Sequence, residues 1–139
     1  MSIFRMGAIR AAITVALTLG PNAIYAQQGV PKGNKGFLTS KTEIVELGPE
    51  IDGMSGRQLR LRILNIEPGG HIGIHSHKNR PSVVYVVKGA TTVYFADGTK
   101  KVVSAGQTTS ANKNTTHWHI NEGKEPAVFI AVDVFQPSK

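Results

Sequence analysis

The feature that most constrains the fold is a succession of short runs rich in valine, isoleucine, threonine and aromatic residues, separated by glycine, proline, asparagine and aspartate. Because the apolar positions show no 3.6-residue period, these runs predict strands rather than helices. Asp97-Gly98 between two such runs is typical of a β-hairpin, since its type I′ turn requires positive φ angles. Many short antiparallel strands must close into a barrel or a two-sheet sandwich to hide their edges. The sequence therefore predicts an all-β domain.

The expected strands differ in which faces they bury. The segment from Arg57 to Ile63 alternates charged and apolar residues, so one face is expected in solvent and the other in the core. The segment from Ala127 to Val132 is apolar on both faces and suits a central strand. A turn is expected at Pro68-Gly69-Gly70. The expected strands are 42–47, 58–67, 71–77, 82–88, 91–96, 100–104, 107–111, 116–121 and 127–135.

Residues 1–26 have the composition of a secretory signal peptide rather than of a folded element. Arg5 and Arg10 are the only charges there, an apolar run follows over 11–19, and Ala26 is a small residue suited to cleavage. An uncleaved membrane anchor is the alternative, but the apolar run is shorter than the roughly 20 residues that span a bilayer. We therefore expect cleavage after Ala26, a periplasmic or secreted protein, and no stable membrane insertion after cleavage.

The mature chain is expected to form one domain, because 139 residues with 40% hydrophobic residues suffice for one core and not for two. Residues 27–36 are rich in glycine, proline and lysine and are expected to be a flexible leader, with the barrel domain at 37–139. The chain has no cysteine, so metal ligands must come from His, Asp or Glu. Its formal net charge of +7 is scattered and forms no stripe interleaved with stacking aromatics, which argues against nucleic-acid binding.

All five histidines lie in two neighbourhoods, His71, His75 and His77 in one and His117 and His119 in the other. Residues two apart on a strand share a face, so the imidazoles of His75 and His77 can converge on one metal ion. A histidine from a distant strand would complete the set. His71 has the same parity but lies about 13 Å from His75 on a regular strand, too far to share the ion.

The spacing around these histidines resembles the two motifs of the cupin superfamily. The first is Gly69-x5-His75-x-His77-x4-Ser82-x6-Gly89, and the second is Gly98-x5-Ser104-x-Gly106 followed by His117-x3-Asn121. The resemblance covers Leu64 to Val134 and implies a small single-domain cupin, whose fold is a jelly-roll or double-stranded β-helix barrel. Two positions depart from the pattern, since Ser82 stands where the family usually has a glutamate ligand and Ser104 where it usually has a proline.

The resemblance implies that His75, His77 and His117 are metal ligands and that Asn121 supports a turn or a contact behind them. The cofactor would be one divalent ion, with Zn, Fe, Mn, Ni and Cu all compatible with imidazole ligands. Ser82 would be a poor ligand, so three neutral histidines would leave the charge of the ion unneutralised and at least one position open. Such a centre is a good Lewis acid and binds anions. A barrel without an ion, in which the imidazoles bond one another and solvent, is the alternative.

Two further residues are candidates for chemistry. His119 shares the parity of His117, and it is a candidate catalytic acid or base because an imidazole titrates near neutrality. Its His-Trp-His setting is similar to that of small cupins that include manganese-dependent hydroxynitrile lyases; a structural role is the alternative. Arg80, in the loop after His77, is a candidate substrate-binding residue that could clamp a carboxylate, and an exposed loop arginine is the alternative. Trp118 should point to the opposite face.

Together these observations predict an exported metal-binding cupin domain protein. Its first candidate role is that of a small metalloenzyme of the dioxygenase, lyase or isomerase type, acting on a small oxygenated or anionic molecule. The alternative is a non-catalytic periplasmic cupin that binds a small ligand or a metal. The sequence contains no nucleophile elbow, P-loop or dinucleotide fingerprint. The resemblance is also compatible with a homodimer.

Overall fold

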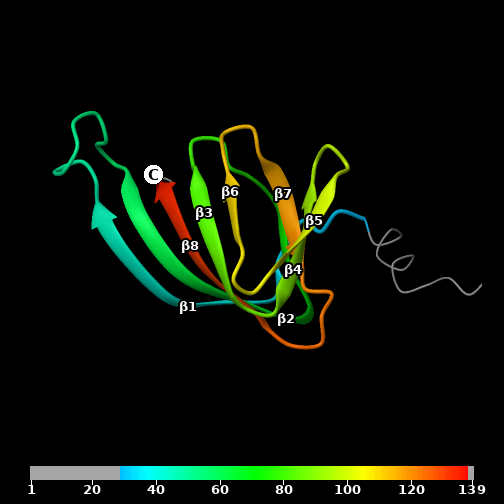
Figure 1. Ribbon diagram of the computed structural model, residues 1–139. Coiled ribbons are helices and arrows are strands. Elements are labelled where there is room, and N and C mark those ends of the chain that lie inside the picture. Colours follow the sequence, from blue (N-terminus) through cyan, green and yellow to red (C-terminus); the bar gives the residue numbers. More distant parts are fainter. Residues whose placement is uncertain (1–28, 138–139) are drawn as a thin grey trace, which may run out of the picture.

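The computed structural model describes residues 29–137, which form a nearly closed antiparallel β-barrel (Figure 1). No helix occurs in this part of the chain, so the predicted all-β class is confirmed, and the strands form the barrel that the sequence suggested. The strands are β1 (Lys35–Glu46), β2 (Gln58–Ser76), β3 (Ser82–Lys88), β4 (Ala90–Phe95), β5 (Lys100–Ser104), β6 (Thr108–Ala111), β7 (Thr116–Ile120) and β8 (Ala127–Phe135).

The strands are hydrogen-bonded in the order β5-β4-β7-β2-β8-β3-β6, and β1 pairs with β2 outside this path. Every pairing is antiparallel. Strands β5 and β6 are therefore the two ends of the sheet, and β2 is its centre. This order places β7 beside β2, so histidines distant in sequence become neighbours across the sheet.

Strand β2 is one long bent strand, whereas the sequence suggested two strands separated by a turn. Residues 58–66 pair with β8 and residues 71–76 pair with β7. The bend lies at Pro68-Gly69-Gly70, where Gly69 has a φ of 71° that favours glycine. The expected turn was wrong because the backbone of Asn121 holds the bend on both sides, accepting from Gly69 N at 2.9 Å and donating to Gly70 O at 3.0 Å.

The hydrophobic core fills the interior of the barrel beside this bend. Ile66 and Phe129, from the paired strands β2 and β8, are almost fully buried and lie next to small residues that leave room for the aromatic ring. This packing removes apolar surface from water and is the main stabilising contribution to the fold. The buried members of the core are Leu64, Ile66, Val86, Val93, Val103, Ala127, Phe129 and Ala131.

In the first half of β2 the charged face points inward and the apolar face points outward, which is the reverse of what the alternating sequence suggested. Arg60 and Arg62 point into the barrel, where both bind the carboxylate of Asp133, with distances of 2.8 and 3.1 Å from their Nη2 atoms to its Oδ2. The apolar partners in the alternation, including Leu59, which is 41% exposed, lie on the outer face. The expectation of a solvated arginine face was wrong because Asp133 supplies a buried counter-charge that the local pattern does not reveal.

The segment before β1 lies against the second half of β2. We call residues 31–34 the N-terminal strap. Ile74 N donates to Pro31 O at 2.7 Å, and Gly73 N donates to the Asn34 side chain at 2.9 Å. A Cβ on Gly73 would lie 2.6 Å from Gly33 O, so only glycine allows this approach. Part of the segment expected to be a flexible leader thus makes specific contacts with the barrel.

The expected signal segment, residues 1–26, lies outside the described residues, as does the cleavage site after Ala26. Within residues 29–137, no helix has the length and hydropathy needed to cross a membrane.

Asn121 is expected to be the most important polar residue for stability. Its fully buried side chain donates to Ile66 O and to Glu125 O, both at 2.8 Å, and accepts from Gly123 N at 2.9 Å. Asn121→Ala would leave these buried groups without partners and is expected to lower the free energy of unfolding by about 2 to 4 kcal/mol. Urea denaturation measures the change. Asn114→Ala, at an exposed turn, should cost less than about 0.5 kcal/mol, and equal effects of the two substitutions would contradict this account.

Candidate metal centre

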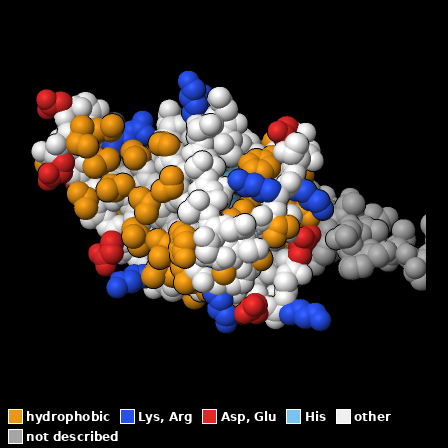
Figure 2. Space-filling model, viewed as in Figure 1, with side chains coloured by type: hydrophobic (Ala, Val, Ile, Leu, Met, Phe, Trp, Pro, Cys, Tyr) orange, Lys and Arg blue, Asp and Glu red, His pale blue; other side chains and the backbone are white. Residues whose placement is uncertain are grey.

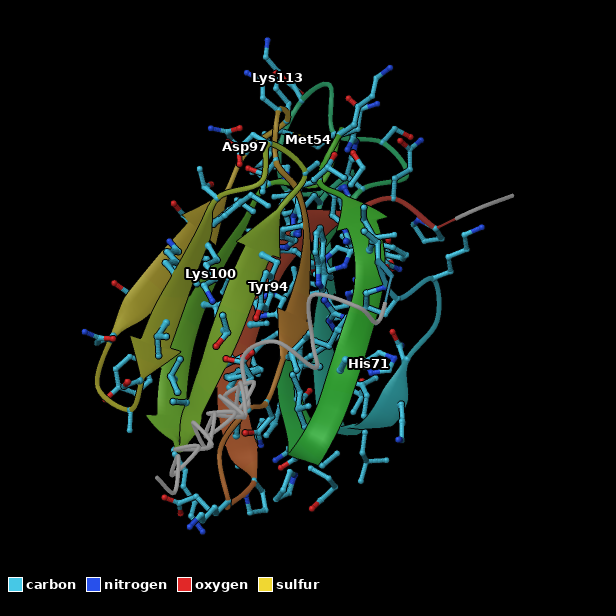
Figure 3. The ribbon with its side chains drawn as sticks, turned by 90° about the vertical axis from the view of Figure 1, so that its right-hand side faces the viewer. Met54, His71, Tyr94, Asp97, Lys100 and Lys113 are labelled. Carbon is cyan, nitrogen blue, oxygen red and sulfur yellow. The ribbon has the colours of Figure 1, made fainter. Side chains whose placement is uncertain are left out.

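A β-bulge in β2 determines which of its side chains enter the barrel. Ile72 pairs with His119 and His75 pairs with His117, so β2 uses one residue more than β7 between these two pairs. The extra residue reverses the parity of the strand, because Ile72 and His75 then share the inner face. The prediction that His71 and His75 share a face was therefore wrong. Figure 3 shows His71 toward the end of the barrel opposite Met54, Asp97 and Lys113.

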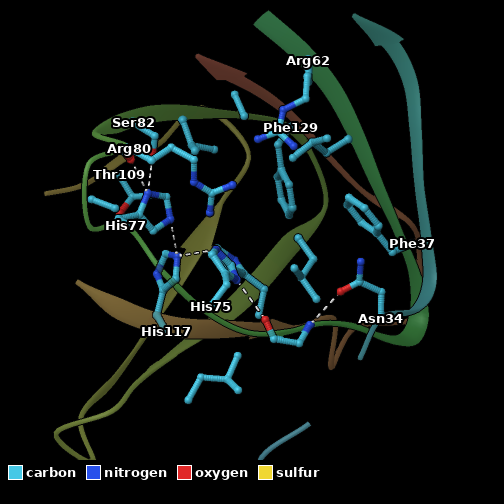
Figure 4. A pocket seen from close by; sticks show the side chains of 18 of the residues that line it. Asn34, Phe37, Arg62, His75, His77, Arg80, Ser82, Thr109, His117 and Phe129 are labelled. Atoms are coloured by element: carbon cyan, nitrogen blue, oxygen red, sulfur yellow. Dashed lines mark hydrogen bonds between the residues drawn. The ribbon is translucent and has the colours of Figure 1, made fainter. Parts of the chain in front are cut away.

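Three imidazoles converge inside the barrel (Figure 4). His117 Nε2 lies 3.0 Å from His77 Nε2 and 3.1 Å from His75 Nε2. One ring nitrogen from each of the three residues lies within 4.8 Å of the others. His77 and His117 are 5% and 6% exposed, and His75 is partly buried. The structure thus brings together the three residues that the sequence proposed as ligands.

The other nitrogens of two of these rings are bound to the backbone. His75 Nδ1 lies 2.9 Å from Gly73 O, and His77 Nδ1 lies 2.9 Å from Arg80 O. A carbonyl oxygen can only accept, so each Nδ1 must carry the proton and donate it. In the neutral rings the Nε2 atoms of His75 and His77 therefore present lone pairs to the centre of the cluster. This is the arrangement in which carbonyl oxygens orient metal-binding imidazoles.

The surroundings of the cluster favour neutral rings. Burial lowers the pKa of His77 to about 4, although the bond to Arg80 O opposes the shift and the charge of Arg80 adds to it. Burial and the neighbouring His119, His75 and His77 lower the pKa of His117 to about 2. Burial also lowers the pKa of His75. The rings consequently stay unprotonated at neutral pH, the state that metal binding requires.

The donor set fits a metal ion. The lone pairs of His75 and His77 both point at His117 Nε2, which can donate its proton to only one of them, so a cation at this point would satisfy all three nitrogens together. Imidazole nitrogens bound to one ion at about 2.0 to 2.1 Å lie about 3 to 3.4 Å apart for bond angles between octahedral and tetrahedral values, close to the 3.0 and 3.1 Å that separate His117 Nε2 from the other two nitrogens. The His75, His77 and His117 group could therefore hold a metal ion.

Ser82 stands behind the cluster rather than within it. Its Oγ lies 3.2 Å from His77 Nδ1, the nitrogen that also faces Arg80 O, and it is therefore on the side of the ring away from the three converging Nε2 atoms. The residue at the family's usual glutamate position thus contacts a histidine ring instead of supplying a charged ligand.

His119 lies beside the three-histidine group. Its ring centroid is 4.8 Å from that of His117 and 6.1 Å from that of Phe129. The side chain is only 7% exposed, and its buried Nδ1 has no hydrogen-bond partner among residues 29–137. Burial, with smaller contributions from His75, His77 and Lys101, lowers the pKa of His119 to about 3. Trp118 points to the opposite face, where it stacks on Tyr94 with ring centroids 5.5 Å apart.

The imidazoles line a cavity of about 270 Å³ whose lining includes both cationic and apolar side chains. Arg80, a candidate from the sequence, extends into it (Figure 4), and Lys32 and Arg62 also line it. Burial lowers the pKa of Arg80, with the charge of Asp133 opposing the shift. No carboxylate is found among the described residues that line this cavity. Its apolar lining is Phe37, Leu64, Ile72, Ile74, Val84, Ala111, Phe129 and Ala131.

Several of these cavity residues were not identified from the sequence. Arg62 was missed because the alternation around it suggested a solvated arginine, and Lys32 because it lies in the segment expected to be a flexible leader. The available signal for Arg62 was that it shares a strand face with Leu64. That signal helps only if this face is already known to point into the barrel. Asn34 and Phe37 gave no signal, since their place in the cavity follows from the pairing of the N-terminal strap and β1 with β2.

Comparison with known proteins supports the architecture. The chain is similar to a germin-like protein of Morus alba, with 25% identity over 113 residues that cover 78% of this chain and 54% of that protein. It spans about half the length of such curated relatives. A protein with a double-stranded β-helix domain from Klebsiella pneumoniae shares the fold at a TM-score of 0.58 and 20% identity, covering 77% of this chain and 84% of the other.

The polyketide cyclase RemF from Streptomyces resistomycificus also shares the fold, with a TM-score of 0.58 and 20% identity over 78% of this chain and 72% of the cyclase. Residues 62–133 match the cupin domain family. The match begins at Arg62 on β2 and ends at Asp133 on β8, and it contains all the converging histidines. The chain therefore belongs to the cupin domain family.

Proposed function

We propose that the protein is an exported cupin that binds one divalent metal ion through His75, His77 and His117 and acts as a small metalloenzyme. The convergence of the three Nε2 atoms is the observation that supports this most directly. When bound, the ion would supply Lewis-acid chemistry toward a small oxygenated or anionic molecule, in a reaction of the dioxygenase, lyase or isomerase type. Zn, Fe, Mn, Ni and Cu all suit imidazole ligands.

The chain's own residues would supply the remaining functions. Gly73 O and Arg80 O hold the protons on the Nδ1 atoms of His75 and His77, so the ring orientations are set before an ion binds. His119 is the candidate acid or base, because it lies beside His117 with a buried nitrogen that no described residue satisfies. Arg80 is the candidate substrate-binding residue. The low pKa of His119 keeps its ring unprotonated at neutral pH.

A non-catalytic role as a periplasmic small-ligand or metal-binding protein is the alternative. The small cavity favours it as much as it favours catalysis, because an enclosed basic pocket can retain a ligand without changing it. The same fold carries an enzyme in the polyketide cyclase, but a fold alone does not assign an activity. Signal cleavage after Ala26 and a periplasmic or secreted location belong to both versions of the proposal.

The proposed ligand set predicts a specific pattern of metal binding. Protein stripped with a chelator, reloaded with Zn²⁺ or Mn²⁺ and desalted should hold about one ion per chain by elemental analysis. His117→Ala removes the ligand shared by both close nitrogen pairs and should reduce the content at least about tenfold, since a lost ligand weakens binding at least as much as a lost supporting residue. The matched control is His71→Ala, which removes a histidine from the same strand outside the cluster. Loss of metal in the control, or its retention in His117→Ala, would refute the ligand assignment.

The catalytic role of His119 predicts a separation of turnover from binding. A metal-loaded protein is assayed with small oxygenated and anionic molecules for oxygen uptake and for lyase and isomerase products. His119→Ala should lower turnover by about 100-fold or more, the usual range for a general acid or base, while metal content stays unchanged. If the wild-type protein binds a molecule of the panel but converts none, the non-catalytic alternative is supported and the enzyme proposal fails.

We also propose a homodimer formed through the outer face of β2, β8 and β3, which we call the outer apolar face. In one of its two central rows Val132 pairs with both Leu61 and Val83. In the other row Ile130 pairs with both Ile63 and Tyr85. Val83 and Tyr85 are 58% and 45% exposed, and Figure 2 shows hydrophobic side chains gathered on the side where β8 and β3 lie in Figure 1. Exposed apolar sheet faces of this kind mark interaction sites.

A second copy is the occupant that the charges of this face fit. Its β1 margin carries one cation and one anion, since Lys41 pairs with Ile63 and Glu43 pairs with Leu61. A two-fold interface uses the same patch on both subunits, so an apolar centre with a charge-balanced margin is self-complementary. Closed two-fold dimers are also the commonest assemblies of identical chains.

The dimer proposal is tested by light scattering coupled to size-exclusion chromatography. The wild-type protein should have twice the mass of one chain at micromolar concentration. Val83→Lys places a charge in the centre of the outer apolar face and should give monomers, because an unpaired interfacial charge is strongly unfavourable. Val102→Lys on β5 is the control, since Val102 is 62% exposed and lies outside this face. A monomeric wild type, or a Val83→Lys variant that remains dimeric, would contradict the proposal.

A further inference from the structure

The charge of the cavity is unbalanced. Lys32, Arg62 and Arg80 line it, and no described lining residue carries a carboxylate. Asp133, which is not among the lining residues, is 2% exposed and already binds both Arg60 and Arg62. A metal ion held by neutral imidazoles would add to the positive charge. The described residues therefore leave the positive charge of the cavity uncompensated, and a bound anion would balance it.

Arg62 has a donor without an acceptor. Its Nη2 binds Asp133 Oδ2 at 3.1 Å, which fixes the guanidinium, but its Nε is buried and has no hydrogen-bond partner among the described residues. A buried donor of a cationic group that is left unpaired costs free energy, so such groups usually bind something. Arg62 also lines the cavity, so its cationic group adds to the positive charge that a ligand there would meet.

Arg80 offers a second donor group, and hydrogen bonds hold its backbone in place. Its backbone N donates to His77 O at 2.9 Å and its backbone O accepts from His77 Nδ1, so the turn that orients a proposed metal ligand also places Arg80. Figure 4 shows its guanidinium extending into the cavity on the same side as Arg62. Among residues 29–137 the guanidinium makes no hydrogen bond or ion pair. Its planar donors are free for an oxyanion.

The cavity also has an apolar lining. Phe37, Leu64 and Phe129 contribute to it, and Figure 4 shows Phe129 beside Arg62 and Phe37 farther from Arg80. If a small hydrated anion such as inorganic phosphate bound here, the apolar side chains of this lining would remain in contact with water. An anion with an apolar body satisfies the cationic and the apolar side chains at once. The cavity volume of about 270 Å³ restricts such a molecule to a small one.

We propose that the cavity binds a small carboxylate with an apolar body, whose carboxylate is held by Arg80 close to the charge of Arg62 and whose body packs on Phe37, Leu64 and Phe129. A guanidinium matches the planar geometry of a carboxylate with two parallel hydrogen bonds, which favours this anion over others of similar charge. The inference refines the ligand class of the proposed metalloenzyme and rests on that function for its biological meaning. The arginine contacts themselves do not require the ion.

The experiment is isothermal titration calorimetry with chelator-stripped wild-type protein at low salt. The probes are benzoate and butyrate, the neutral amides benzamide and butyramide, and inorganic phosphate. At least one carboxylate should bind at least about tenfold more tightly than its amide and than phosphate, because the amide has one acceptor oxygen and no charge to pair with the arginines. Arg80→Gln should weaken the carboxylate by about tenfold or more and leave the amide unchanged.

Controls separate the clamp from general electrostatics and from folding. Lys113→Gln removes a cation from an exposed turn and should leave carboxylate binding unchanged. Arg62→Lys keeps a cation beside Asp133 and at the cavity, and it should keep the preference for the carboxylate over its amide, with circular dichroism confirming the fold of each variant. Equal binding of carboxylate and amide, tighter binding of phosphate, no binding of either carboxylate, or an unchanged Arg80→Gln variant would each overturn the proposal.

The same titrations distinguish this inference from the metal proposal. His117→Ala should lose metal and still discriminate the carboxylate from its amide, because the arginines are unchanged. A wild-type protein that binds metal but shows no carboxylate preference would overturn the clamp and leave the metal site standing. A protein that prefers the carboxylate but binds no metal would do the opposite.

Discussion

Three imidazole nitrogens that point at one another inside a barrel are the constraint on which the rest of the site depends. His75 and His77 cannot turn their Nε2 atoms away, because their Nδ1 atoms donate to Gly73 O and Arg80 O. His117 approaches both from the neighbouring strand at about 3 Å. His117 Nε2 can donate to only one of these two nitrogens, so one lone pair of the cluster stays unsatisfied unless a cation binds it. The backbone around β2 thus fixes an arrangement of the imidazoles that a bound metal ion would stabilise.

The long strand β2 connects this geometry to the rest of the fold. Its first half turns Arg60 and Arg62 inward toward Asp133, and its second half, after the bend at Gly69 and the bulge before His75, presents the histidines. The N-terminal strap binds the bulge through Gly73 N, which lies beside the carbonyl that holds His75. One strand therefore supplies a cationic side chain of the cavity lining, two of the imidazoles and the groups that orient them.

Much of this arrangement follows from local sequence, and the remainder depends on pairings that local sequence does not contain. The all-β class, most strand positions and the meeting of His75, His77 and His117 could be predicted from residue patterns and motif spacing. The inward arginines could not, because their buried partner Asp133 is about 70 residues away on another strand. The bulge was invisible for a similar reason, since only the pairing with β7 reveals the extra residue.

The most direct test of the central claim is a crystal structure of protein purified from its own compartment, with anomalous scattering data recorded at metal absorption edges. The account predicts one anomalous peak about 2.0 to 2.3 Å from the Nε2 atoms of His75, His77 and His117, with both Nδ1 bonds to the backbone intact. An ion bound elsewhere, an ion bound through Nδ1, or three rings that diverge around ordered water would contradict it.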